Sequence, residues 1–141
     1  MTVPYSQTFL IEGKNFFNAG KAAAEIKAIL RQLGIRADIV RRVAIATYEA
    51  EMNVVMYARR AMLTLSVTPQ DISISVDDEG PGIPDVNLAM QEGYSTATDE
   101  MRELGFGAGM GLPNIKRNAD QLLISAVAGK GTRLDFTIHL R

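Results

Sequence analysis

The chain has 141 residues, enough for one compact domain and too short for two of ordinary size. Its 15 basic and 16 acidic side chains nearly cancel, so no overall field favours nucleic acid or an anionic membrane as a partner. Cysteine is absent and there is one histidine, His139, which excludes disulfide scaffolds, cysteine nucleophiles and Cys/His zinc sites. No apolar stretch approaches the roughly 18 residues of a membrane span, and the N-terminus lacks signal-peptide features, so we expect a cytoplasmic protein.

The first sixty residues predict one strand and two helices. Apolar residues at period two predict an edge strand over residues 5–11. Asn15 can cap a helix whose apolar positions recur at steps of three and four, and which Gly34 ends. Asp38 is a good N-cap for a second helix over about residues 39–58, apolar on most sides and therefore expected to be heavily buried.

The remaining residues predict four more strands and two further helices. The strands follow from alternating apolar residues at 63–67, 72–76, 122–126 and 134–140. A short helix is expected around residues 85–92, and another should begin at Leu112-Pro113, because proline suits the first helical turn. The element order predicts a mainly antiparallel sheet with helices on one face, an α+β two-layer sandwich in which residues 1–141 form a single domain.

Two polar residues stand out on the apolar second helix. Glu49 and Asn53 are four residues apart, so both side chains lie on one helical face. An amide carbonyl can ligate Mg²⁺, and a carboxylate one turn away can deprotonate a hydroxyl that attacks phosphorus. The alternative is that Glu49 forms an ion pair with a nearby arginine, of which the candidates are Arg42, Arg59 and Arg60.

Glycine is concentrated in one part of the chain, since seven of the twelve glycines fall within residues 80–111. The first group follows a predicted strand as Asp78-x-Gly80-x-Gly82. A carboxylate there can accept a hydrogen bond from the exocyclic amine of adenine, and glycines let a flat base approach the backbone. The alternative is a tight turn, which this composition forms readily.

The second group alternates strictly, at Gly105, Gly107, Gly109 and Gly111. Unobstructed backbone N–H groups make anion-binding concavities, and the helix opening at Pro113 adds the positive end of its dipole. The surrounding carboxylates would repel a triphosphate, and a bound divalent cation resolves that conflict. A flexible loop is the alternative.

In the order and spacing of these segments the chain resembles the GHKL ATPase superfamily, whose nucleotide site is called the Bergerat fold. The Asn box of that superfamily matches Glu49 and Asn53. Its three glycine boxes match Asp78-x-Gly80-x-Gly82, Gly107-x-Gly109-x-Gly111-Leu112 and Gly129-Lys130-Gly131-Thr132. The resemblance covers essentially the whole chain and implies a histidine-kinase-like ATPase domain.

Within the superfamily, a lone short domain looks like the bacterial anti-sigma-factor and stress-switch serine/threonine protein kinases. Sensor histidine kinases need a phospho-acceptor histidine. His139 instead lies with other polar residues on the polar face of the last predicted strand, so it is expected at the surface. The chain departs from switch kinases in the longer segment 97–104 and at Met52, where they often place a basic residue.

The resemblance implies a role for each matched residue, with ATP and Mg²⁺ as cofactors. Glu49 would be the catalytic base, Asn53 the Mg²⁺ ligand and Asp78 the adenine-reading carboxylate. The other nucleotide-binding residues would be Gly80, Gly82, Gly105, Gly107, Gly109, Gly111, Leu112 and Thr132.

The leading hypothesis is therefore a protein kinase that phosphorylates Ser or Thr on a small antagonist protein. A second hypothesis is an anti-sigma or partner-switch module that regulates by binding, with little kinase turnover. A sigma factor and a second copy of the chain are possible further partners, and a stand-alone hydrolase has little support. Basic residues of the two helices could engage an acidic partner, or form a solvated face: Lys21, Lys27, Arg31, Arg36, Arg41 and Arg42.

Overall fold

Five antiparallel strands form one sheet in the order β1-β2-β3-β5-β4. The structure, a computed structural model, describes residues 5–80, 111–127 and 129–140. Its elements are β1 Tyr5–Glu12, the 3₁₀ turn η1 Phe16–Asn18, α1 Lys21–Gln32, α2 Ala37–Tyr57, β2 Arg60–Val67, β3 Asp71–Glu79, α5 Gly111–Asn118, β4 Gln121–Val127 and β5 Gly131–His139. The predicted strands are confirmed, and β1 is an edge strand as expected.

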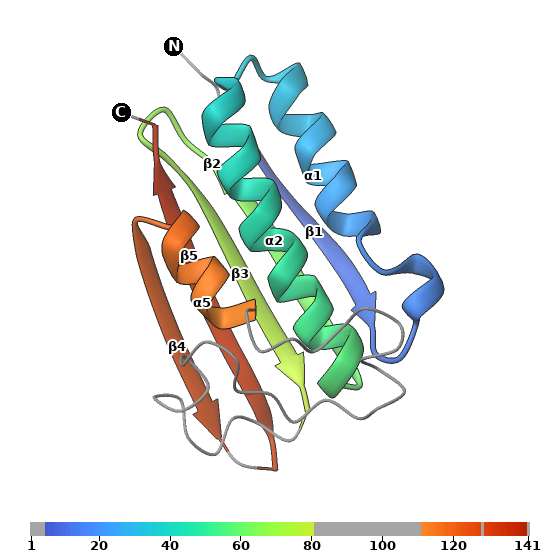
Figure 1. Cartoon of the computed structure of the whole chain (residues 1–141). Coiled ribbons are helices and arrows are strands. Elements are labelled where there is room, and N and C mark those ends of the chain that lie inside the picture. The colour runs from blue at the N-terminus through green and yellow to red at the C-terminus, as the bar shows by residue number, and fades with distance from the viewer. Residues whose placement is uncertain (1–4, 81–110, 128, 141) are drawn as a thin grey trace.

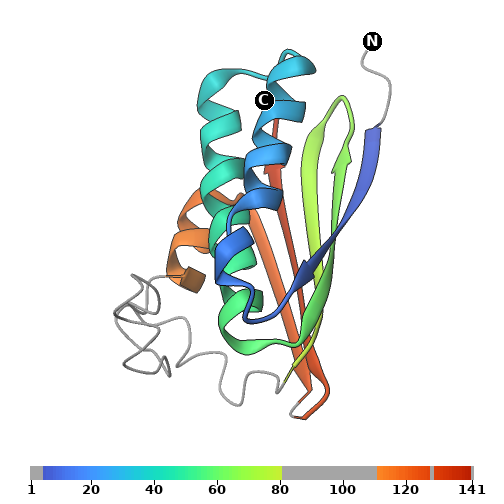
Figure 2. The same ribbon diagram turned by 90° about the vertical axis from the view of Figure 1, so that its right-hand side faces the viewer.

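The helices α1, α2 and α5 lie side by side on one face of the sheet (Figure 1). In the view turned by 90°, none of the helices that the structure describes lies on the other face of the sheet (Figure 2). This arrangement confirms the predicted α+β sandwich with helices on one face.

The core lies between the sheet and the helices. Leu65, Ile74 and Phe136 are neighbours across β2, β3 and β5, and none exposes more than 1% of its surface. The residues on either side of them in sequence point to the open face, because side chains alternate along a strand. Burying each such large apolar side chain contributes about 1.5–3 kcal/mol, so the alternating apolar residues of the strands stabilise the sheet against the helices.

Helix α2 is packed on three sides. It contacts α1, α5 and the sheet, and eleven of its residues are buried. Val43, Ala46, Ala50 and Val54 are at most 3% exposed within the main core. The apolar character of this helix predicted that burial correctly.

The start of α1 differs from the prediction. Asn15 accepts the N–H of Asn18 at 3.4 Å and so caps the turn η1, not the long helix. Helix α1 begins only after Gly20, whose φ of +91° is a left-handed conformation that interrupts a right-handed helix and favours glycine. Gly34, also at positive φ, follows the helix's C-terminus as expected.

The N-cap predicted for α2 is also wrong. The helix begins at Ala37 after Arg36, which makes no side-chain capping bond. Asp38 lies within the first turn, where a carboxylate favours the positive end of the helix dipole. Its bonds to Arg36, the shorter at 3.0 Å, lower the pKa of the Asp38 carboxyl below its usual range.

A buried carboxylate supplies the cap that α1 lacks in its own sequence. Glu51 of α2 is 2% exposed and accepts the backbone N–H groups of Gly20, Ala22 and Ala23 at 3.0, 3.3 and 2.9 Å. These are N–H groups that the first turn of a helix cannot satisfy internally. Glu51 therefore joins α2 to the N-terminus of α1.

Helix α5 is tied to α2 from its C-terminal end. Arg42 donates to the carbonyl of Asn118 at 3.0 Å and to Asp120 at 3.1 Å. Asp120 also accepts the backbone N–H of His139 at 2.7 Å, and this bond, followed by that from Arg42, lowers the pKa of the Asp120 carboxyl. The position of α5 is thus fixed by α2 and β5 together.

Two sequence-based expectations fall outside the described residues, the short helix around residues 85–92 and the longer segment 97–104. In the part of the chain that the structure describes, no helix combines the length and apolarity needed to cross a membrane.

Replacing Glu51 by alanine should destabilise the fold by about 3 kcal/mol, because three backbone N–H groups, two of them buried, lose a charged acceptor. The measurement is urea denaturation followed by circular dichroism. Glu25→Ala is the matched control, since Glu25 is exposed on α1 and its removal should change the free energy of unfolding by less than about 0.5 kcal/mol. Equal midpoints for the two variants would contradict the capping role.

Candidate functional site

Glu49 and Asn53 are half-buried on the side of α2 that faces the start of α5. A Cβ at Gly111 would lie 3.4 Å from Asn53 Oδ1 and 3.6 Å from Glu49 Oε2. The two side chains therefore border one small space, which the missing side chain of Gly111 leaves open. The spacing of four residues predicted that they share a face.

Two of the three arginines offered as ion-pair partners of Glu49, Arg42 and Arg60, have other acceptors. Arg42 binds Asp120, and Arg60 pairs with Glu79, which raises the pKa of Arg60 and lowers that of Glu79. Glu49 instead accepts a hydrogen bond at Oε1 from Asn114 Nδ2 of α5, at 3.2 Å. This carboxylate has a neutral donor on one oxygen, with the other beside the space next to Gly111.

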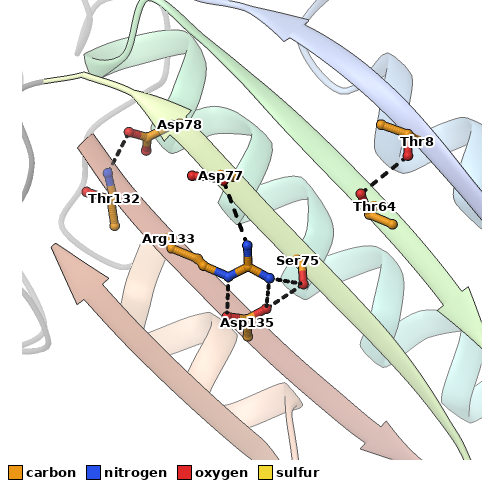
Figure 3. A network of polar contacts seen from close by, with 8 residues as sticks. All are labelled: Thr8, Thr64, Ser75, Asp77, Asp78, Thr132, Arg133 and Asp135. Carbon is orange, nitrogen blue, oxygen red and sulfur yellow. Dashed lines mark hydrogen bonds and ion pairs between the residues drawn. The ribbon is translucent and has the colours of Figure 1, made fainter. Parts of the chain in front are cut away.

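Asp78 lies near the end of β3, half-buried, with its carboxylate turned toward β5 (Figure 3). Its Oδ1 accepts the backbone N–H of Thr132 at 2.9 Å. Burial raises the pKa of the Asp78 carboxyl, the Thr132 bond opposes that rise, and the neighbouring charge of Asp77 adds to it. The first and third glycine motifs are thus in direct contact.

Two glycines beside Asp78 have packing reasons. Gly131 has φ +149°, and a Cβ there would lie 2.1 Å from the carbonyl oxygen of Asp78, which excludes any side chain. At Gly80 a Cβ would lie 3.1 Å from Cα of Ala58, at the end of α2. The sequence explained Gly80 by the approach of a base, whereas the structure also requires the approach of Ala58.

Asp78 with its neighbouring glycines, and Glu49 with Asn53, lie at the same end of α2. Asn53 is one turn from Tyr57, about 6 Å along the helix axis, and Ala58 follows at once against Gly80. The end of α2 therefore connects the predicted adenine side of the site to the predicted phosphate side.

The helix α5 begins at the site. Gly111 is its first residue, and its N-terminal N–H groups and positive dipole end lie beside Asn53. Leu112 is buried in the main core, so its side chain anchors α5 and only its backbone is available to a ligand. Gly82, Gly105, Gly107 and Gly109 lie outside the described residues.

Asn114 is a residue that the sequence did not single out. It lies one turn into α5, and only its contact with Glu49, 65 positions earlier, reveals it. The available signal was its place in the first turn after the alternating glycines, on a helix expected to face the site. Glu51 was missed in the same way, although a carboxylate on the buried side of an apolar helix requires a partner.

The other sequence expectations have clear positions. Met52 is buried in a small second cluster with Met56, against Phe16 and Ala19, so the residue there packs under η1. His139 is exposed at the end of β5, as predicted. On the open face of the sheet, Arg133 bonds Asp135 and pairs with Asp77 (Figure 3).

Comparisons with known proteins identify the family of the chain. Residues 17–138 match the family model of the histidine kinase-like ATPase domain. The chain is 30% identical over 117 residues to the serine/threonine-protein kinase RsbT of Bacillus subtilis, covering 80% of this chain and 82% of that protein. It is 30% identical over 128 residues to the anti-sigma F factor of Caldanaerobacter subterraneus, covering 87% and 86%.

A solved structure of RsbU and RsbW domains from Mycobacterium tuberculosis superposes with a TM-score of 0.62 at 16% identity. It covers 97% of this chain and 32% of that longer chain, and the likeness concerns the fold. The family model and the sequence relatives show the family, and the structural likeness shows the fold. The chain belongs to the histidine kinase-like ATPase family.

Proposed function

We propose that this chain is a serine/threonine protein kinase that uses ATP and Mg²⁺ to phosphorylate a small antagonist protein in the cytoplasm, as a single-domain anti-sigma or switch kinase. The observation that carries the proposal is that Glu49 Oε2 and Asn53 Oδ1 border the same space beside Gly111. The relatives named as a serine/threonine kinase and as anti-sigma F factors support the reaction class.

In the reaction, the acceptor hydroxyl oxygen of the antagonist attacks the γ-phosphorus of ATP. The bond between that phosphorus and the bridging oxygen breaks, and ADP leaves with the bond's electron pair. The hydroxyl proton passes to the carboxylate of Glu49 at Oε2. Asp78 holds the adenine by accepting from its exocyclic amine, which orients the triphosphate toward Asn53 and the N-terminus of α5.

The residues at this site fit Mg²⁺. The ion typically takes one or two protein oxygens, with phosphates and water completing its octahedral shell. Asn53 Oδ1 would hold it, and when bound the ion neutralises charge on the phosphates. Among the described residues no group of three His, Cys, Asp or Glu could form a metal cage, which agrees with a site completed by the substrate.

The second candidate is a binding module that uses ATP mainly to control a partner, with little turnover. The anti-sigma F factor relatives favour it. Of the basic residues offered for an acidic partner, Arg36 and Arg42 are paired with Asp38 and Asp120. A pull-down with and without ATP, with Asn53→Ala as the control, separates this module from a nucleotide-independent binder.

Glu49→Gln should retain ATP binding and reduce transfer of labelled γ-phosphate to the antagonist by about 10²–10⁴-fold, the usual contribution of a general base. The acceptor is a small candidate antagonist protein with a phosphorylatable Ser or Thr. Glu25→Gln, an exposed glutamate on α1, is the control and should transfer label at the wild-type rate. Wild-type transfer by Glu49→Gln would show that the base is wrongly assigned. ATP binding by the unmutated protein with no detectable transfer of label would favour the binding module.

Asp78→Asn should lower ATP affinity about tenfold or more, because the adenine amine loses a charged acceptor. Asp77→Asn is the matched control, since Asp77 directly precedes Asp78 and is exposed on the other face of the sheet. This variant should leave the affinity for ATP unchanged. Isothermal titration calorimetry measures both. Equal affinities for the two variants would contradict the adenine role of Asp78.

The pKa of Asp78, raised by burial, gives these variants a pH signature. As pH falls through that raised pKa the wild-type carboxylate is protonated, so its advantage over Asp78→Asn in ATP affinity should vanish at a higher pH than an ordinary aspartate would give. A folded-state pKa above the unfolded one means that the charged group opposes folding at pH values above it. Without ATP, Asp78→Asn should therefore be at least as stable as wild type at neutral pH, by thermal denaturation.

A further inference from the structure

The contact between α5 and the proposed base involves a single amide side chain. Asn114 Nδ2 donates to Glu49 Oε1 at 3.2 Å, and Asn114 Oδ1 accepts from Arg117 Nη1 at 2.9 Å. Both atoms of the amide are therefore engaged, one with a carboxylate and one with a guanidinium.

Arg117 determines which way the amide of Asn114 faces. A guanidinium only donates hydrogen bonds, so the amide atom that it contacts must be the oxygen. A carboxylate only accepts, so the amide nitrogen must face Glu49. The two charged neighbours select the same orientation of Asn114, and that orientation presents a donor to Glu49.

The bond from Asn114 makes the two carboxylate oxygens of Glu49 differ in their surroundings. Oε1 is held by the amide, while Oε2 lies 3.6 Å from the position that a Cβ of Gly111 would take. A glutamate without such a donor can rotate about three side-chain bonds, and a base must be within hydrogen-bond reach of the proton that it removes. The other oxygen of Glu49, Oε2, therefore faces the space beside Asn53.

We propose that Asn114 is a positioning residue for phosphoryl transfer, which holds Glu49 so that Oε2 faces the acceptor hydroxyl. This inference rests on the proposed function. It adds α5 to the catalytic machinery, because the helix that begins at Gly111 also carries the group that orients the base.

A purely structural role for Asn114 would be to join α5 to α2. Other contacts already do this, since Arg42 binds the carbonyl of Asn118 and the carboxylate of Asp120. Leu112 and Ile115 also bury α5 in the core, at 7% and 0% exposure. The bond of Asn114 to Glu49 is therefore not needed to keep α5 in place.

Asn114→Ala should leave the melting temperature unchanged and the Kd for ATP with Mg²⁺ within about twofold of wild type. It should lower the rate of γ-phosphate transfer about 10–100-fold, since small misplacements of a reacting group have effects of that size. Transfer is measured under single-turnover conditions, with enzyme in excess over γ-labelled ATP and the candidate antagonist as acceptor. Asn114→Gln keeps the amide donor and should recover part of the lost rate.

Asn118→Ala is the matched control, because Asn118 has the same side chain one turn later and donates only to the backbone carbonyl of Asn114, at 2.8 Å. It should keep the wild-type rate. A wild-type rate for Asn114→Ala, or an equal loss in Asn118→Ala, would overturn the positioning role. If Glu49→Gln loses transfer while Asn114→Ala keeps the wild-type rate, only this inference fails, whereas normal transfer by Glu49→Gln removes the proposed function itself.

Discussion

The burial of helix α2 is the constraint on which the other features depend. A helix that is apolar on most sides must be covered, and here the sheet, α1 and α5 cover it. What remains is an exposed side with Arg41, Ile45 and Tyr48, and a half-buried edge that carries Glu49 and Asn53. Packing therefore decides where polar chemistry can occur, and it places both groups against the first turn of α5, next to Gly111.

Two glutamates of α2 show how this constraint separates structure from chemistry. Glu49 and Glu51 are two residues apart, so they point in directions about 200° apart on the helix. Glu51 is buried and is saturated by three backbone N–H groups at the start of α1. Glu49 has one neutral donor and keeps an oxygen beside the site. The same side chain is a structural cap in one direction and a candidate base in the other.

Local patterns predicted the parts of the molecule that local patterns determine. The strands follow from alternating apolar residues, and the shared face of Glu49 and Asn53 follows from their spacing. The start of α1 was mispredicted because a left-handed Gly20 and a carboxylate from another helix, 28 to 31 residues away, decide it. The contacts of Asn114 with Glu49 and of Asp78 with Thr132 also join distant residues, and only the packing of helices and strands brings them together.

The glycines give the sharpest separation between the needs of the fold and the needs of a ligand. Gly131 is required by the protein itself, since a Cβ would collide with the carbonyl of Asp78, and Gly80 is nearly so because of Ala58. At Gly111 a Cβ would lie 3.4–3.7 Å from Asn53 and Glu49, which is ordinary van der Waals contact. The described fold therefore has room for alanine at position 111. Under the proposed function, glycine at this position leaves the space beside Asn53 and Glu49 to the γ-phosphate and the acceptor hydroxyl.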